Sequence, residues 1–485
     1  MHAACVPAVI SYQPRRPAES PLYGIVVDHC EKFAAVYDDL YTDRYGRWRP
    51  EVADTFHRFL DCGVLAHGFL RVRCSACGHE VRVPWSCKKV GWCPSCGQRR
   101  SLEFAEFLEA ELLDEVAYRH VVATVPRLLR PIFMRERALL GELGRCLWTA
   151  VCRGLREALG VKAATPGAVT GNATLGDSAN PHPHIHGMFS AGAWNGRAED
   201  AAFLPWPAEL NEERLTELFL LDMLVKRQRL SRSTAEKFLG WEHSGFSVFL
   251  GDPITPGNTE SRRRLARYLV RAPLSLERLR YDASTCRVQY GSKKQGKQRD
   301  MSALDFLAEV SVAIPDRGQH LVSHWGRHSN RSRGERLAAL ATAAGDEAAL
   351  PQGGGATSQT EDVEPVLERK RKAFRIAWAT LLRKVWDVDS MACPRCFSRM
   401  EIVAAITELS VVERILKHVG LFEKPRGPTI HECPTPPSGT DGQTLLVFPP
   451  RTLGVQFPAT PAPTHSVEDP RLRDEWPTDP PFEDD

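Results

Sequence analysis

Two closely spaced pairs of cysteines constrain most strongly what this 485-residue chain can fold into. Cys74-Ser-Ala-Cys77 is followed, after fifteen residues, by Cys93-Pro-Ser-Cys96. Each CxxC turn aims two thiolates at one point, and two such turns supply the four sulfur ligands of a closed structural zinc site. We therefore expect one structural zinc on Cys74, Cys77, Cys93 and Cys96, with Cys87 as a further candidate ligand.

The remaining composition fits an ordinary globular protein of several domains, with 43% hydrophobic and 25% charged residues. The first residues lack the basic stretch followed by an apolar stretch that marks an export signal, so the 14 cysteines are not expected to form a disulfide framework. The chain has no run of about 18 apolar residues, so no membrane span is expected.

Basic residues are clustered although the net charge is only +3. Clusters occur at 262–264, at 293–299 and at 370–372, and clustered Lys and Arg suit a polyanion such as DNA. Solvated helix faces produce the same pattern. Around the cysteine pairs, the basic residues expected to contact phosphate are Arg71, Arg73, Arg82, Lys88, Lys89, Arg99 and Arg100.

A second motif, His182-Pro-His184-Ile-His186, reads as a strand. Alternate residues of a strand share a face, so His184 and His186 point the same way and could hold one metal ion, while Ile185 packs into the core behind them. Pro183 predicts that the strand either is an edge strand or begins there, which makes His182 a weaker candidate ligand. Because an HxH pair also opens amidohydrolase metal sites, this motif alone leaves the class of enzyme open.

A third motif places a tyrosine among arginines on a predicted helix that ends at Pro273. Arg264 precedes Tyr268 by four residues and Arg271 follows it by three, so both are its neighbours on the helix surface. Guanidinium groups favour the phenolate form of tyrosine and bind phosphate. The pattern suits attack of Tyr268 on a phosphodiester; a tyrosine at a helix edge among solvated arginines is the simpler alternative.

Together these blocks resemble the transposases of the insertion-sequence-91 family and related common-region elements, over about residues 23–421. The resemblance rests on FLDCGVLAHGFLRVRCSACG, SCKKVGWCPSCGQRR, the histidine strand, LARYLVRAPLSLERL, WATLLRKVWDVDSMACPRC and ERILKHVGL. In addition, RHVVATVP from residue 119 is similar to the family's first catalytic strand.

The family is similar to rolling-circle initiators and relaxases, whose signature is His-hydrophobic-His (HUH). The resemblance implies an α+β fold: an antiparallel-sheet HUH endonuclease core with helices on one face, a helical N-terminal zinc-binding module and a helical C-terminal region. It also implies that His184, Ile185 and His186 form the signature and that His184 and His186 hold catalytic magnesium or manganese. His182 is one candidate third ligand; a distant Asp, Glu or Gln is another.

The resemblance assigns the nucleophile to Tyr268 and phosphate binding to Arg264, Arg267 and Arg271. Some family members carry a second tyrosine where this chain has Arg264, so a one-tyrosine enzyme is expected. The implied function is a transposase that cleaves and rejoins single-stranded DNA at the ends of its mobile element through a covalent 5′-phosphotyrosine. The expected partners are single-stranded DNA and element-end DNA, in the bacterial cytoplasm and away from membranes. A DNA-binding regulator with an inactive core and a metal-dependent amidohydrolase are the alternatives.

The expected organisation divides the chain into six parts. They are an extension (1–20), the zinc-binding module (21–112), the catalytic domain (115–335), a linker (338–364), a helical region (366–425) and a proline-rich, disordered tail (426–485). Within the catalytic domain we expect a long helix from Leu139 to Leu159 closed by Gly160, strands at 287–290 and 319–325, and a helix at 302–313. Cys393 and Cys396 form a third CxxC, which His431 and Cys433 could complete as a metal site.

Overall fold

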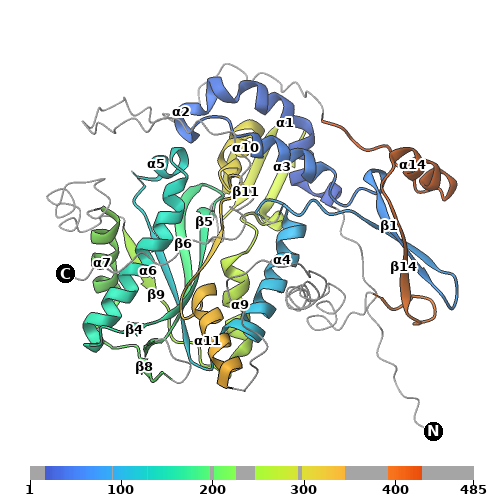
Figure 1. Ribbon diagram of the computed structural model, residues 1–485. Helices are drawn as coiled ribbons and strands as arrows, with labels where there is room; N and C mark the ends of the chain where they lie inside the picture. Colours follow the sequence, from blue (N-terminus) through green and yellow to red (C-terminus); the bar gives the residue numbers. More distant parts are fainter. Residues whose placement is uncertain are drawn as a thin grey trace, which may run out of the picture. The chain divides into compact units, whose positions relative to one another are not determined.

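The computed structural model describes residues 17–89, 91–127, 129–196, 201–224, 246–292, 298–343 and 391–428 (Figure 1). They belong to one compact unit, residues 1–433; residues 434–485 form a second unit that lies outside the described residues. Several predictions also fall outside them: the basic clusters at 293–297 and 370–372, helix 366–390, the tail from residue 429, and the ligands His431 and Cys433.

The N-terminal module is built from helices and one β-hairpin. Its main helices are α1 (Pro21–Leu40), α3 (Pro50–Leu60) and α4 (Pro94–Phe107). The Ser20 side chain caps α1 by accepting a hydrogen bond from the backbone NH of Tyr23. The hairpin consists of β1 (Phe69–Cys74) and β2 (Glu80–Pro84), and β14 (Met400–Ile406) pairs antiparallel with the other side of β1. A segment near the C-terminal end of the described chain thus completes an N-terminal sheet (Figure 1).

A five-stranded antiparallel sheet forms the centre of the unit, in the order β13-β5-β6-β3-β9. Its strands are β3 (Tyr118–Thr124), β5 (Gly167–Leu175), β6 (Pro181–Ser190), β9 (Ser247–Leu250) and β13 (Val322–Gly326). The expected α+β class with an antiparallel sheet is confirmed. The histidine motif lies on β6, which is the middle strand, so the edge-strand interpretation of Pro183 is wrong and the strand-start interpretation holds.

Helices cover both faces of this sheet, so the expectation of helices on one face is wrong (Figure 1). Helix α6 (Ala138–Leu159) packs on the face that carries Ile185 and Ala123. Helix α9 (Thr259–Leu269) packs on the opposite face through Leu265 and Leu269, against Met188. The reason is that strands buried on both sides need apolar cover on both sides. As predicted, α6 ends at Gly160, which adopts the left-handed conformation with φ +65°.

The expected elements at 287–290, 302–313 and 319–325 correspond to β11 (Arg287–Gly291), α10 (Ala303–Ser311) and β13. Helix α1 packs on α10 and on β10 (Leu279–Asp282), so one apolar core runs from the N-terminal helices to the central sheet. The expected linker start at residue 338 falls inside α11 (Asn330–Ala343). The remaining bounds are η1 Pro17–Glu19, α2 Thr42–Tyr45, η2 Leu65–His67, η3 Leu108–Leu112, α5 Arg130–Arg135, β4 Ala164–Thr165, β7 Gly192–Asn195, β8 Phe203–Pro205, α7 Glu212–Leu224, η4 Leu276–Arg278, β12 Gln298–Ser302 and α14 Leu409–His418.

Among the described helices, none combines the length and the apolar character needed to cross a bilayer.

Candidate active site

The histidine motif lies where its alternation predicts. His184 and His186 share one face of β6, with ring centroids 4.7 Å apart, and Ile185 is fully buried on the other face. The Nδ1–H of His184 donates to the backbone carbonyl of His182 at 2.6 Å, because a carbonyl can only accept. The Nε2 of His184 therefore carries the lone pair and is available as a metal ligand.

His120, on the neighbouring strand β3, joins this group and was not predicted as a site residue. Its Nε2 lies 3.2 Å from Nδ1 of His186, and the two rings stack at 5.3 Å. Strand β3 pairs with β6 so that Val122 faces His186, which puts His120 on the histidine face. Alternation along the strand predicts that His120 and Val121 point to opposite faces of the sheet. It does not predict how β3 aligns with β6, and that alignment is what brings His120 to the other histidines.

His182 lies at the entrance of the strand, and its ring centroid is 5.0 Å from that of His184. Its Nε2 is buried and has no hydrogen-bond partner among the described residues. A buried nitrogen without a partner is costly unless a ligand satisfies it. His182 is thus a stronger candidate ligand than its position beside Pro183 suggested.

Burial favours the neutral form of the imidazoles of His120, His182 and His184. It lowers the pKa of His120 and of His182 to about 4, and it also lowers the pKa of His184. For His182, the nearby guanidinium of Arg130 lowers the pKa further. Neutral imidazole is the form that binds metal ions, so near neutral pH the group needs to release no proton first.

Tyr268 stands over the histidines, on the last turn of α9. Its ring centroid lies 4.7 Å from that of His186 and 5.8 Å from that of His120, both nearly edge-on. The guanidinium of Arg271 lies over the tyrosine ring at 4.9 Å from the centroid. The structure therefore brings a phenol, three imidazoles and a guanidinium together from segments that the sequence predicted separately.

Two features hold α9 in this position. Asn258 caps its first turn by accepting a hydrogen bond from Ser261 N, and Leu265, Ala266 and Leu269 are buried against the sheet. The helix ends at Leu269, four residues before Pro273, so the predicted end was too late. Gly171 on β5 lies opposite His186 and lets the helix approach closely; an added Cβ there would lie 2.3 Å from the carbonyl oxygen of Leu269.

The arginine triplet of α9 is largely structural. Arg262 is 1% exposed and lies 3.1 Å from Glu109 of η3. Arg263 lies 3.1 Å from Glu106 of α4. These two ion pairs join α9 to α4 and η3, and Figure 1 shows α9 beside α4. Arg264 is exposed and bonds to Ser261 Oγ, and Arg267 pairs with Glu260 at 2.8 Å. Among the predicted phosphate contacts, the exposed Arg264 and Arg271 are the best placed.

The cysteines form two clusters of four, and neither is the predicted set. The first is Cys62, Cys87, Cys93 and Cys96. In it, Cys62 Sγ lies 3.8 Å from Cys93 Sγ and 3.9 Å from Cys96 Sγ, and Cys87 Sγ lies 3.6 Å from Cys96 Sγ. Four sulfurs around one zinc at about 2.3 Å stand about 3.8 Å apart, so the spacing fits a tetrahedral site.

The predicted single site on both CxxC pairs is therefore wrong in its ligands. Cys93 and Cys96 are joined by Cys87, the fifth candidate, and by Cys62, which the sequence analysis did not select. Cys74 and Cys77 belong instead to a second cluster with Cys393 and Cys396, in place of the suggested His431 and Cys433. The physical reason is that Cys62 follows α3 and reaches the turn at the start of α4 in space, whereas β1 carries Cys74 towards β14.

Several basic residues of the N-terminal module already pair with carboxylates, so fewer of them can contact phosphate than the sequence suggests. Arg71 donates to Glu80 at 2.9 Å, and Arg82 lies 3.8 Å from the same carboxylate. Lys89 pairs with Asp54 at 2.6 Å, and Arg99 pairs with Glu103 at 2.8 Å. Their contact with phosphate stays a prediction.

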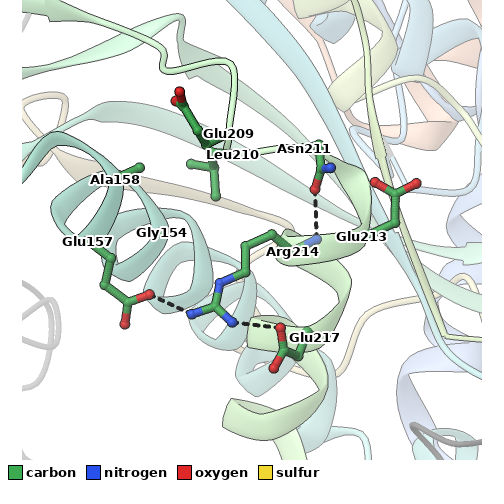
Figure 2. A pocket seen from close by; sticks show the side chains of 9 residues that line it. All are labelled: Gly154, Glu157, Ala158, Glu209, Leu210, Asn211, Glu213, Arg214 and Glu217. Atoms are coloured by element: carbon green, nitrogen blue, oxygen red, sulfur yellow. Dashed lines mark hydrogen bonds and ion pairs between the residues drawn. The ribbon is translucent and has the colours of Figure 1, made fainter.

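A pocket of about 510 Å³ lies between α6 and α7 and shares no residue with the histidine–tyrosine group (Figure 2). Arg214 of α7 reaches across it to Glu157 of α6 at 2.8 Å and also pairs with Glu217 of its own helix at 2.6 Å (Figure 2). Glu209 and Glu213 add further negative charge to the lining. An acidic lining repels phosphate, so we do not assign the nucleic-acid site to this pocket.

Comparisons with known proteins find two family domains in the chain and one similar curated protein. Residues 32–125 match the family described as "Transposase zinc-binding domain", and residues 167–336 match the family described as "Putative transposase". The chain is 25% identical, over 393 residues, to the transposase for insertion sequence element IS801 of Pseudomonas savastanoi pv. phaseolicola, covering 76% of this chain and 87% of that protein.

No solved structure matches the chain. The first family match includes the complete first cysteine cluster and His120, and the second includes the histidine strand and Tyr268. Cys393 and Cys396 lie outside both. The order of the two matched domains and the similarity along most of the IS801 protein lead to one conclusion: this chain is a transposase of the insertion-sequence-91 family.

Proposed function

We propose that this transposase cleaves and rejoins single-stranded DNA at the ends of its mobile element through a covalent bond between Tyr268 and a 5′ phosphate. One observation carries the proposal: the ring of Tyr268 lies 4.7 Å from that of His186, on the sheet face that also holds His184 and His120. A nucleophile beside potential metal ligands is the arrangement that phosphodiester transfer needs.

In the proposed step, Tyr268 Oη attacks the scissile phosphorus. The bond from phosphorus to the 3′ oxygen breaks, the phenol loses its proton, and the departing 3′ oxygen gains one. Arg271, stacked on the tyrosine ring, stabilises the phenolate and the charge on the phosphate. The phosphotyrosine keeps the energy of the phosphodiester, so a 3′ hydroxyl of another DNA strand can reverse the step and complete strand transfer.

A divalent ion fits the histidine group. His182, His184 and His186 lie on one strand face, and burial lowers the pKa of His182 and of His184. The Nε2 of His184 carries the lone pair, and the Nε2 of His182 is buried without a hydrogen-bond partner among the described residues. In the described structure, the nitrogens of these three residues do not all lie within 4.8 Å of one another, so we expect the rings to turn inward on binding. Bound there, the ion would act as a Lewis acid at the phosphate.

The donor set also bears on which ion binds. Imidazole nitrogen suits transition ions better than magnesium, which prefers oxygen ligands. Of the two ions expected from the sequence, we therefore favour manganese. The structural zinc of the N-terminal module belongs, in this proposal, to Cys62, Cys87, Cys93 and Cys96, which close the site without leaving a position for substrate.

The test is incubation of the full chain with a single-stranded oligonucleotide from the element end, in manganese, followed by a denaturing gel and mass spectrometry of the digested adduct. We expect one nucleotide-bearing peptide, the one that contains Tyr268. Tyr268→Phe should bind the oligonucleotide with unchanged affinity and form no adduct, because it lacks only the attacking oxygen.

Tyr281→Phe is the matched control, since Tyr281 loses a hydroxyl that bonds to Asp28 and His29 and lies outside α9. This variant should form the adduct at the wild-type level. An adduct on any other peptide, or an undiminished adduct with Tyr268→Phe, would contradict the assignment. DNA binding without any adduct in the wild type would favour a regulator with an inactive core.

A further inference from the structure

We propose that Cys74, Cys77, Cys393 and Cys396 bind a second structural zinc ion, which fastens the C-terminal segment 391–428 to the N-terminal module. The four sulfurs lie within 4.8 Å of one another. Cys74 Sγ is 3.5 Å from Cys396 Sγ, and Cys77 Sγ is 3.5 Å from Cys393 Sγ. These separations are close to the roughly 3.8 Å expected around one zinc and far from the roughly 2.05 Å of a disulfide.

The two CxxC turns have the same backbone geometry although they are more than 300 residues apart in the sequence. In the first, Gly78 N donates to Cys74 O at 3.0 Å and Cys74 N donates to His79 O at 2.8 Å. In the second, Phe397 N donates to Cys393 O at 2.8 Å and Cys393 N donates to Ser398 O at 2.8 Å. Two equivalent turns facing each other are how a four-thiolate zinc site is built.

The fifth residue of each turn is left-handed, with φ +69° at Gly78 and φ +60° at Phe397. For glycine this conformation costs little, but for a bulky residue it is strained. Phe397 is 63% exposed, so burial of its ring does not offset the strain. A turn that must present both thiolates to an ion explains why the conformation is kept.

Few buried apolar residues hold the segment 391–428 in place beside the second cysteine cluster. The apolar cluster that includes two of the ligands buries Val72, Cys74, Cys393 and Met400, and Leu70, Val81 and Val83 are partly buried against it. A second small cluster, with Phe69, Val412 and Leu416 buried, holds α14. Closing so long a loop costs chain entropy, and small apolar clusters alone contribute little against it. A zinc cross-link offsets this cost and keeps β14 paired to β1, which would otherwise be an unprotected edge.

This inference is independent of the nuclease proposal, because the test measures metal and not cleavage. Elemental analysis of the full chain, purified with a reductant and without chelator, should give about two zinc ions per chain. The double variant Cys393→Ser, Cys396→Ser should keep about one, bound to the first cluster. Arg395→Ser changes an exposed side chain between the two ligands and should keep both.

Alkylation with mass spectrometry of the wild type provides a readout that does not depend on how the variants fold. The four cysteines of the second cluster should react slowly until zinc is removed, and then react together. About one zinc in the wild type, about two in the double variant, or a Cys74–Cys396 or Cys77–Cys393 disulfide in the reduced preparation would each overturn the second site.

Discussion

At the scale of single residues, His120 is placed to orient the proposed metal ligand His186. Its Nε2 faces Nδ1 of His186 at 3.2 Å. If His186 donates from Nδ1, its Nε2 carries the lone pair that a metal ligand needs, just as Nε2 of His184 carries one because its Nδ1–H donates to the His182 carbonyl. Such partners fix the tautomer and the ring angle of a ligating histidine. His120 is therefore a positioning residue in the proposed site.

We predict that His120→Ala raises the manganese concentration for half-maximal adduct formation by about 10- to 100-fold, with oligonucleotide binding unchanged. His120→Gln keeps an acceptor and should recover most of the loss. The control is His57→Ala, since His57 is exposed and pairs with Glu31. The measurement is adduct yield across a manganese titration. Equal manganese requirements for His120→Ala and wild type would show that His120 does not act through the ion.

The same residues show what the sequence could predict. Alternation along one strand correctly placed His184 and His186 on one face and Ile185 in the core. His120 and Cys62 were missed because their roles depend on which strand or turn lies beside them, which is set by long-range pairing. Local spacing also suggested the wrong cysteine partners, since two CxxC pairs near in sequence need not meet in space.

At the scale of elements, the distance between α9 and the sheet determines where Tyr268 stands. Gly171 on β5 has no side chain, so the end of α9 can pack directly on the strand. Strong periodicity made α6 and its Gly160 end predictable. The end of α9 and the second helical layer were not predictable, because they depend on the apolar cover that each sheet face requires.

We predict that Gly171→Ala lowers the rate of adduct formation by about 100-fold, because a displacement of about 1 Å at a reacting group has effects of that size. The new Cβ would lie 2.3 Å from Leu269 O and 3.1 Å from its carbonyl carbon, and a backbone can yield only if the helix moves. The cost in folding free energy should be about 1–3 kcal/mol.

The control for this helix displacement is Gly257→Ala, two residues before the start of α9, where an added Cβ meets no atom within 4 Å. It should leave both rate and stability near wild type. The measurements are single-turnover adduct formation and denaturant unfolding. A Gly171→Ala protein that is destabilised but reacts at the wild-type rate would show that the helix position does not control the chemistry.

At the scale of the whole molecule, the two cysteine clusters differ in what they join. The first links the end of α3 to the start of α4, within a short stretch of chain. The second links β1 to the segment before β14, so the N-terminal sheet is complete only when the C-terminal segment is present. This long-range closure could not be predicted from the third CxxC alone, whose nearest candidate partners in sequence were His431 and Cys433.

The last prediction follows from the exposure of the two clusters. Cys62, Cys93 and Cys96 of the first are buried, whereas Cys77 and Cys396 of the second are exposed. A chelator reaches exposed thiolates first, so zinc release should be biphasic, with pulse alkylation marking Cys77 and Cys396 in the fast phase. Limited proteolysis after the fast phase should release segment 391–428 and leave the central sheet resistant, because β14 then depends on two small apolar clusters. Release in a single phase, or first labelling of Cys62, would mean that the clusters do not hold separate ions of different accessibility.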